Sequence, residues 1–163
     1  MRHLPALVLP ALAVVALLAG CTSAPPVDEE ALSAWQDAQE KSGAGDDALA
    51  TLYSRVDTGE GQTDASGELQ RGITITFEHP EQIDHLEFSC FGGARMSGQV
   101  TTTSEATSRT TSTDPMRCSD GQQRVDLPRT WKRDVHSISF NAFDSDRDSA
   151  WQVLVVSAGT DTD

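Results

Sequence analysis

The fold is decided by one short segment, Ile83-Asp84-His85-Leu86-Glu87-Phe88-Ser89-Cys90-Phe91. Apolar Leu86, Phe88 and Cys90 alternate there with polar His85, Glu87 and Ser89. Because successive side chains of a strand point to opposite faces, this alternation predicts a β-strand with one face in a hydrophobic core. We therefore expect Cys90 to point inward.

The same two-residue period recurs along the second half of the chain. Alternating segments lie at residues 73–77, 95–103, 123–127 and 136–143, and residues 151–158 are apolar on both faces. A strand that is apolar on both sides is typical of a central strand covered on two faces. No long helical segments separate these strands, whereas a parallel crossover needs a dozen or more residues. The sequence therefore predicts a mainly β fold, an antiparallel β-sandwich with jelly-roll-like winding.

Two segments near these strands are expected to lie outside them. Glu78-His79-Pro80-Glu81 is typical of a turn. Residues 101–113 consist mostly of Ser and Thr, and threonine favours strands, so the first part is expected to extend a hairpin. The absence of large apolar residues further on predicts an exposed loop over residues 107–114.

A short helical arm is expected ahead of the sandwich. Asp28 and the two glutamates after it place negative charge where a helix N-terminus favours it, and residues 31–41 follow with near-helical spacing. The spacing over residues 46–56 predicts a second helix. Trp35 and Tyr53 are interpreted as docking contacts to the main domain rather than ligand contacts.

These features divide the chain into consecutive segments. They are a signal peptide (1–20), a spacer (21–27), the helical arm (28–57), a linker (58–71), the β-sandwich domain (72–158) and a polar tail (159–163).

Leu18-Ala19-Gly20-Cys21, at the end of the expected signal peptide, looks like the lipobox of bacterial lipoproteins. The apolar run before it has the length of a signal-peptide core rather than of a bilayer span. The resemblance implies a diacylglycerol thioether on Cys21 and cleavage between Gly20 and Cys21. The mature chain would then be anchored at the extracytoplasmic face of the cell membrane, and a second acyl chain would make that attachment stable. The alternatives are an ordinary secretory signal cleaved elsewhere and an anchor that is never cut.

The three cysteines agree with lipidation at Cys21. An odd number of cysteines in an exported protein would leave one reactive thiol. If Cys21 carries lipid, Cys90 and Cys118 remain as a pair in an oxidising compartment, which predicts a disulfide. Two buried free thiols or half of a zinc site are the alternatives, although no CxxC spacing accompanies them.

A looser resemblance concerns the order of features in residues 72–158. A strand cysteine followed by glycines, a second cysteine, a Val-x-Leu strand and a final Trp-x-Val-x-Val strand resemble small lipoproteins of high-GC Gram-positive bacteria. That family has no assigned activity, so the resemblance bears on the fold alone.

The charge of the chain limits its partners. The formal net charge is −13, with 25 acidic residues against 12 Lys and Arg. Such a field repels nucleic acid and anionic lipid head groups, so neither is an expected partner. The expected partners are the membrane, reached through the covalent lipid, and an envelope protein or glycan. The ligand and the oligomeric state stay open.

Candidate binding residues surround Trp131. Arg129, Lys132 and Arg133 make it the one basic cluster of an acidic chain. A tryptophan with neighbouring cations could stack on sugar rings, which gives a polysaccharide-binding module as an alternative function. The other interpretation is core packing of Trp131, with its basic neighbours extending into solvent.

A candidate metal site lies in the run Asp144-x-Asp146-x-Asp148. Carboxylates at alternate positions of a tight loop could bind one hard cation such as calcium. However, Ser149 stands where an EF-hand loop needs Gly, and Val155 stands where it needs Glu. A hydrated hairpin turn is the other interpretation, and no cofactor is expected.

Catalytic signatures are absent from the sequence. His79, His85 and His136 supply imidazoles for a hydrolase or metal-dependent enzyme, but no HExxH spacing, GxSxG elbow or phosphate-binding loop accompanies them. The sequence therefore predicts a lipid-anchored, non-catalytic binding or accessory module of the cell envelope. The hydrolase remains the second alternative.

Overall fold

The computed structural model describes residues 27–43, 45, 47–57, 72–105 and 107–159. The signal peptide, the lipobox and Cys21 lie outside these residues. Among the described helices, none is long and apolar enough to cross a bilayer.

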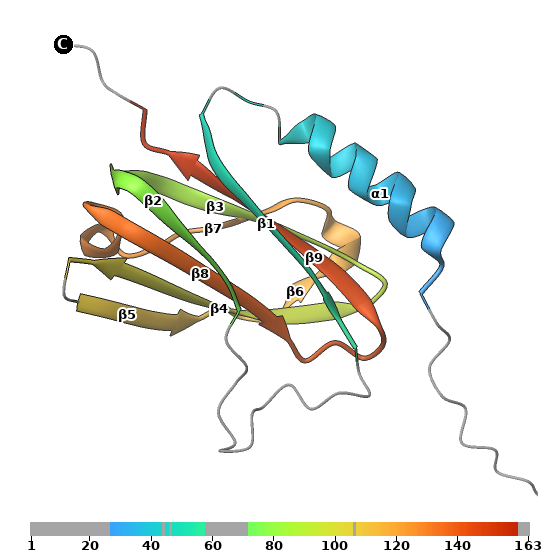
Figure 1. Ribbon diagram of the computed structural model, residues 1–163. Coiled ribbons are helices and arrows are strands. Elements are labelled where there is room, and N and C mark those ends of the chain that lie inside the picture. Colours follow the sequence, from blue (N-terminus) through green and yellow to red (C-terminus); the bar gives the residue numbers. More distant parts are fainter. Residues whose placement is uncertain (1–26, 44, 46, 58–71, 106, 160–163) are drawn as a thin grey trace, which may run out of the picture.

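The domain is an antiparallel β-sandwich, as predicted. One sheet has the strand order β1 (Ala48–Val56), β9 (Ser149–Ser157), β3 (Ile83–Phe91), β7 (Gln123–Val125). The other has the order β2 (Ile73–Glu81), β8 (Val135–Phe143), β4 (Arg95–Ser104), β5 (Thr107–Ser112), and the short β6 (Met116–Arg117) also pairs with β4. Figure 1 shows the two sheets packed face to face. Apart from β6, this strand order is that of a jelly roll, in which the chain repeatedly crosses from one sheet to the other.

The core lies between the sheets and is formed by the alternating residues that the sequence analysis identified. Phe140 of β8 contacts both Phe88 of β3 and Trp151 of β9, with ring centroids 5.6 Å and 5.2 Å apart. All three side chains are buried. Cys90 also points inward and is bonded to Cys118, which begins the 3-10 turn η1 (Cys118–Asp120). The predicted disulfide is therefore confirmed.

Helix α1 (Glu29–Ser42) confirms the first predicted helix and covers the outer face of the β1-β9-β3-β7 sheet. Asp28 caps it, because its carboxylate accepts hydrogen bonds from the N–H groups of Glu30 and Ala31 at 3.1 Å. Trp35 contacts Phe91 of β3 with ring centroids 5.9 Å apart, which confirms its docking role. β9 is thus buried between α1 and the core, as its two apolar faces predict.

The predicted second helix over residues 46–56 is wrong. This segment contains β1, which pairs with β9 and belongs to the sandwich. Leu52 and Val56 are both buried there. A separation of four residues places two side chains on one face of a helix and also on one face of a strand, so their spacing could not distinguish the two.

Two other segments predicted to be irregular are strands. Residues 78–81 complete β2, where the regular pairing with β8 is interrupted between Thr76 and Glu81. Pro80 is tolerated there because β2 is an edge strand. Residues 107–112 form β5 instead of a loop, because they pair with the equally threonine-rich β4.

Candidate functional site

The outer face of the β2-β8-β4-β5 sheet carries closely spaced hydroxyl and amide side chains. In β2, β8 and β4, apolar residues point toward the core, and the intervening positions face away from it. In β8, for example, Ile138 and Phe140 are buried in the core while Ser137, Ser139 and Asn141 lie between them on the outside. The strand alternation that forms the core therefore also forms this polar face.

The strand register aligns these side chains into rows across the sheet. In the central row, Ser139 of β8 pairs with Thr74 of β2 on one side and with Thr101 of β4 on the other, and Thr101 pairs with Thr110 of β5. A neighbouring row consists of Thr76, Ser137, Thr103 and Ser108. On the other side of the central row, Asn141, Gln99 and Ser112 form a third row.

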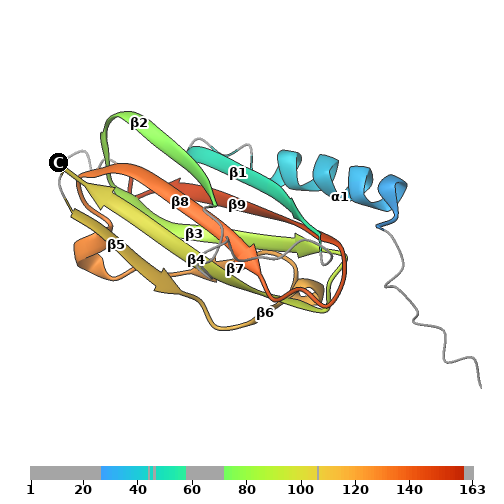
Figure 2. The ribbon, with the colours of Figure 1, turned by 60° about the horizontal axis from the view of Figure 1, so that its bottom comes forward.

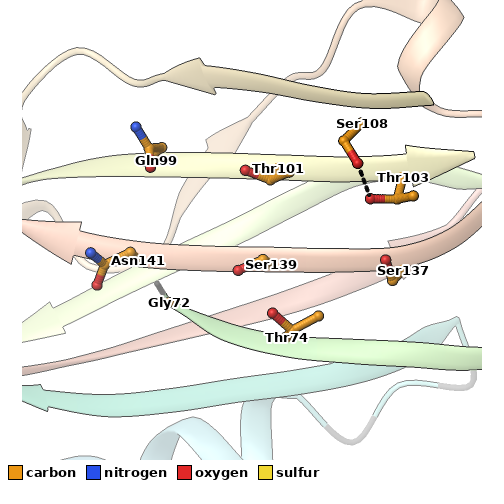
Figure 3. A pocket seen from close by; sticks show the side chains of 9 residues that line it. All are labelled: Gly72, Thr74, Gln99, Thr101, Thr103, Ser108, Ser137, Ser139 and Asn141. Atoms are coloured by element: carbon orange, nitrogen blue, oxygen red, sulfur yellow. Dashed lines mark hydrogen bonds between the residues drawn. The ribbon is translucent and has the colours of Figure 1, made fainter. Parts of the chain in front are cut away.

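This face is hollowed into a groove with a volume of about 400 Å³, called here the polar groove (Figure 3). Its lining residues are Gly72, Thr74, Gln99, Thr101, Thr103, Ser108, Ser137, Ser139 and Asn141. None of them is charged, aromatic or aliphatic. The groove therefore offers only hydroxyl and amide hydrogen-bonding groups, together with exposed backbone.

Part of this hydrogen-bonding capacity is not used within the protein. The Thr101 and Thr110 hydroxyls are 2.8 Å apart, and those of Thr103 and Ser108 are 2.9 Å apart. By contrast, the side chains of Gln99, Ser137 and Ser139 have no hydrogen-bond partner among the described residues. Donors and acceptors thus remain available to a ligand or to water.

The residues around Trp131 do not form a single site. Trp131 ends the 3-10 turn η2 (Arg129–Trp131), and its half-buried side chain packs against the core. Its three basic neighbours line a separate pocket of about 280 Å³, to which Asp84 contributes and Trp131 does not. The indole and the cations of the predicted binding cluster are therefore not arranged around one pocket.

His85 lies in a network of charged residues on the outer side of β3. Its ring nitrogens are 2.8 Å from Asp84 Oδ2 and 3.3 Å from Glu87 Oε1. The hydrogen bond with His85 lowers the pKa of the Asp84 carboxyl below its ordinary value. His79 and His136 belong to the other sheet, on β2 and β8. No group of three His, Cys, Asp or Glu side chains in the described part of the chain could hold a metal ion.

The aspartate run lies in the connection from β8 to β9. The Oδ1 atom of Asp146 accepts a hydrogen bond of 2.8 Å from the backbone N–H of Ala94, in the turn between β3 and β4. This bond lowers the pKa of the Asp146 carboxyl. Asp146 thus connects the β8–β9 connection to the turn between β3 and β4.

The polar groove was not predicted from the sequence, although the sequence contains a signal for it. Thr101 and Thr103 of β4 and Ser137 and Ser139 of β8 recur with the two-residue period of a strand. That period predicts a shared face for each pair, but it does not reveal that β4 and β8 are neighbours.

No protein-family model matches the chain, and no curated protein or solved structure matches it either. The candidate site is therefore assigned from the chemistry of the chain's own residues.

Proposed function

We propose that the protein is a lipid-anchored, extracytoplasmic binding module of the cell envelope, without catalytic activity. Its lipid holds it at the outer side of the membrane through Cys21. Its β-sandwich presents the polar groove as a binding surface.

The observation that carries the anchoring half of the proposal is the pairing of the cysteines. Cys90 and Cys118 are bonded to each other, so Cys21 of the Leu-Ala-Gly-Cys motif is the one cysteine left for another modification. A disulfide is typical of a protein that folds in an oxidising compartment outside the cytoplasm. The strongly negative charge suits attachment through covalent lipid, because anionic head groups repel it.

The absence of titratable groups from the polar groove supports a binding role. Its lining residues include no Asp, Glu, His, Cys, Lys, Arg or Tyr. General acid–base catalysis needs a group that exchanges a proton near the working pH. The lining residues supply hydrogen bonds instead, which suit recognition.

No specific observation favours either of the two alternative functions, a glycan-binding module that uses Trp131 or a hydrolase that uses the histidines. The packing of Trp131 against the core, away from the pocket of its basic neighbours, does not favour a glycan site built on that indole. His85 is held between two carboxylates, and His79 and His136 lie in the other sheet, which does not favour a hydrolase built on the three histidines.

Substitution of Cys21 tests the anchor. The wild-type protein is expected to incorporate labelled palmitate and to partition into the detergent phase. Cys21→Ala is expected to lose the label and to appear either as the uncleaved precursor or in the aqueous phase. Intact-mass analysis separates these two outcomes, and Thr22→Ala, at the next position, is the matched control. An unlabelled wild-type protein, or a Cys21→Ala chain that has the mature mass and stays in the detergent phase, would refute the anchor.

A further inference from the structure

We propose that the polar groove binds an uncharged polyhydroxylated polymer, that is, a neutral glycan chain of the envelope. This inference rests on the proposed function, because it assumes that the module is displayed where such polymers occur. We infer the chemical class of the ligand from three properties of the groove: its lack of charge, its hydrogen-bonding groups and its extent.

The charge argument compares the groove with the rest of the molecule. The chain carries a formal net charge of −13, yet no residue that lines the groove is charged. An anionic polymer would be repelled by the field of the whole protein and would find no cation in the groove. A cationic polymer would be attracted to the acidic residues elsewhere on the surface and not to the groove. The groove therefore selects for a ligand without charge.

The hydrogen-bonding groups match those of a sugar. A Ser or Thr hydroxyl both donates and accepts, and the Gln99 amide presents a donor and an acceptor side by side. Sugar hydroxyls have the same double character, so each can pair with such a group in either direction. The side chains of Gln99, Ser137 and Ser139 have no competing partner among the described residues. A ligand can pair with these groups without first breaking a protein hydrogen bond.

The extent of the polar rows fits a chain rather than a single sugar. Successive rows are two residues apart, about 7 Å along a strand, so three rows extend over about 14 Å. Four neighbouring strands extend over a similar distance across the sheet, since strands lie roughly 5 Å apart. The rows also extend past the residues that line the groove, to Thr76, Thr110 and Ser112, so a polymer can continue beyond it.

A protein partner fits the groove less well. Protein interfaces gain most of their binding energy from buried aromatic or arginine anchors, and the lining of the groove has neither an apolar surface for an aromatic ring nor a carboxylate for an arginine. The lack of an aromatic platform also predicts weak binding at a single groove, and several copies anchored in one membrane would gain avidity by binding the same polymer.

Affinity electrophoresis tests the proposal on the full chain, purified in detergent. Dextran, mannan and galactan in the gel serve as neutral probes, and polygalacturonate serves as an anionic one. At least one neutral polymer is expected to retard the protein, and polygalacturonate is expected to retard it less. Thr101→Val combined with Ser139→Ala removes two central hydroxyls, and is expected to weaken binding by about tenfold or more.

Thr51→Val is the matched control, because Thr51 is an exposed strand threonine of the other sheet and should bind as the wild type does. Gln99→Ala provides a second groove variant if the double variant unfolds. The proposal is overturned if no neutral polymer retards the protein, if polygalacturonate retards it more, or if the groove variants and Thr51→Val behave alike. Polymer binding is measured in detergent, so it does not depend on the lipid. A groove that binds no polymer would not contradict lipidation of Cys21, and a chain without lipid could still bind polymer through the groove.

Discussion

Removal of the disulfide between Cys90 and Cys118 should destabilise the domain by a predictable amount. The bond joins residues 28 positions apart, so it closes a loop that the unfolded chain would otherwise leave free. The loop-entropy relation gives about 3.6 kcal/mol of stabilisation at 25 °C for a loop of this length. A domain of this size has a total stability of roughly 5–15 kcal/mol, so the loss would be a substantial part of it.

Equilibrium unfolding in urea measures this loss. The samples are the oxidised wild type, the reduced wild type and the double variant Cys90→Ala/Cys118→Ala. The reduced wild type isolates loop closure, because it keeps both sulfur atoms in place. The double variant should lose slightly more, since Cys90 is buried at 4% exposure and truncation leaves a small cavity.

The single variants sharpen the test. Each breaks the same bond, so each should lose nearly the whole amount, and the two losses should not add in the double variant. A reduced protein within about 1 kcal/mol of the oxidised one would refute the reasoning, because loop closure would then contribute far less than the entropy relation requires.

Two further substitutions test the packing and the turn contacts. Gly98→Ala would bring a Cβ atom to 2.5 Å from the Phe140 ring, so it should lower the free energy of unfolding by about 1–3 kcal/mol, whereas Gly45→Ala, in open space, should be nearly neutral in the same urea titration. Asp146→Asn removes a carboxylate whose pKa is lowered by the Ala94 N–H, so its stabilising contribution is present above the ordinary pKa of an aspartate and is lost as pH falls through the lowered value. The Tm difference between wild type and Asp146→Asn should therefore shrink from pH 7 toward pH 3, and a difference that grows in acid would contradict this sign.

The sequence predicted those strands of the sandwich that are buried on one face only or on both faces. β3 and β8 were visible because a core on one side forces strict alternation, and β9 was visible because α1 and the core bury both of its faces. β1 was missed because its buried residues are four positions apart, a spacing shared by helices and strands. β5 was missed because it has no large apolar residue, and only its pairing with β4 makes it a strand.

Prediction of the candidate site would have required the strand order of the sheet, which the sequence of a single strand does not contain. Thr101 and Ser139 are far apart along the chain, and the strand order of a jelly roll makes them neighbours. Alternation alone marked both as outward-facing, which is equally true of many solvated residues. By contrast, the disulfide was predictable, because the parity of three cysteines depends on counting and not on strand order.

Helix α1 and the polar groove lie on opposite sides of the sandwich, which fixes the distance between them. From the helix axis to the first sheet is about 10 Å, and a further 10 Å separates the two sheets. A polymer lying in the groove would therefore run roughly 20 Å from the helix through which the chain enters the domain. The three packed layers would therefore separate a ligand in the groove from the helix on the opposite side.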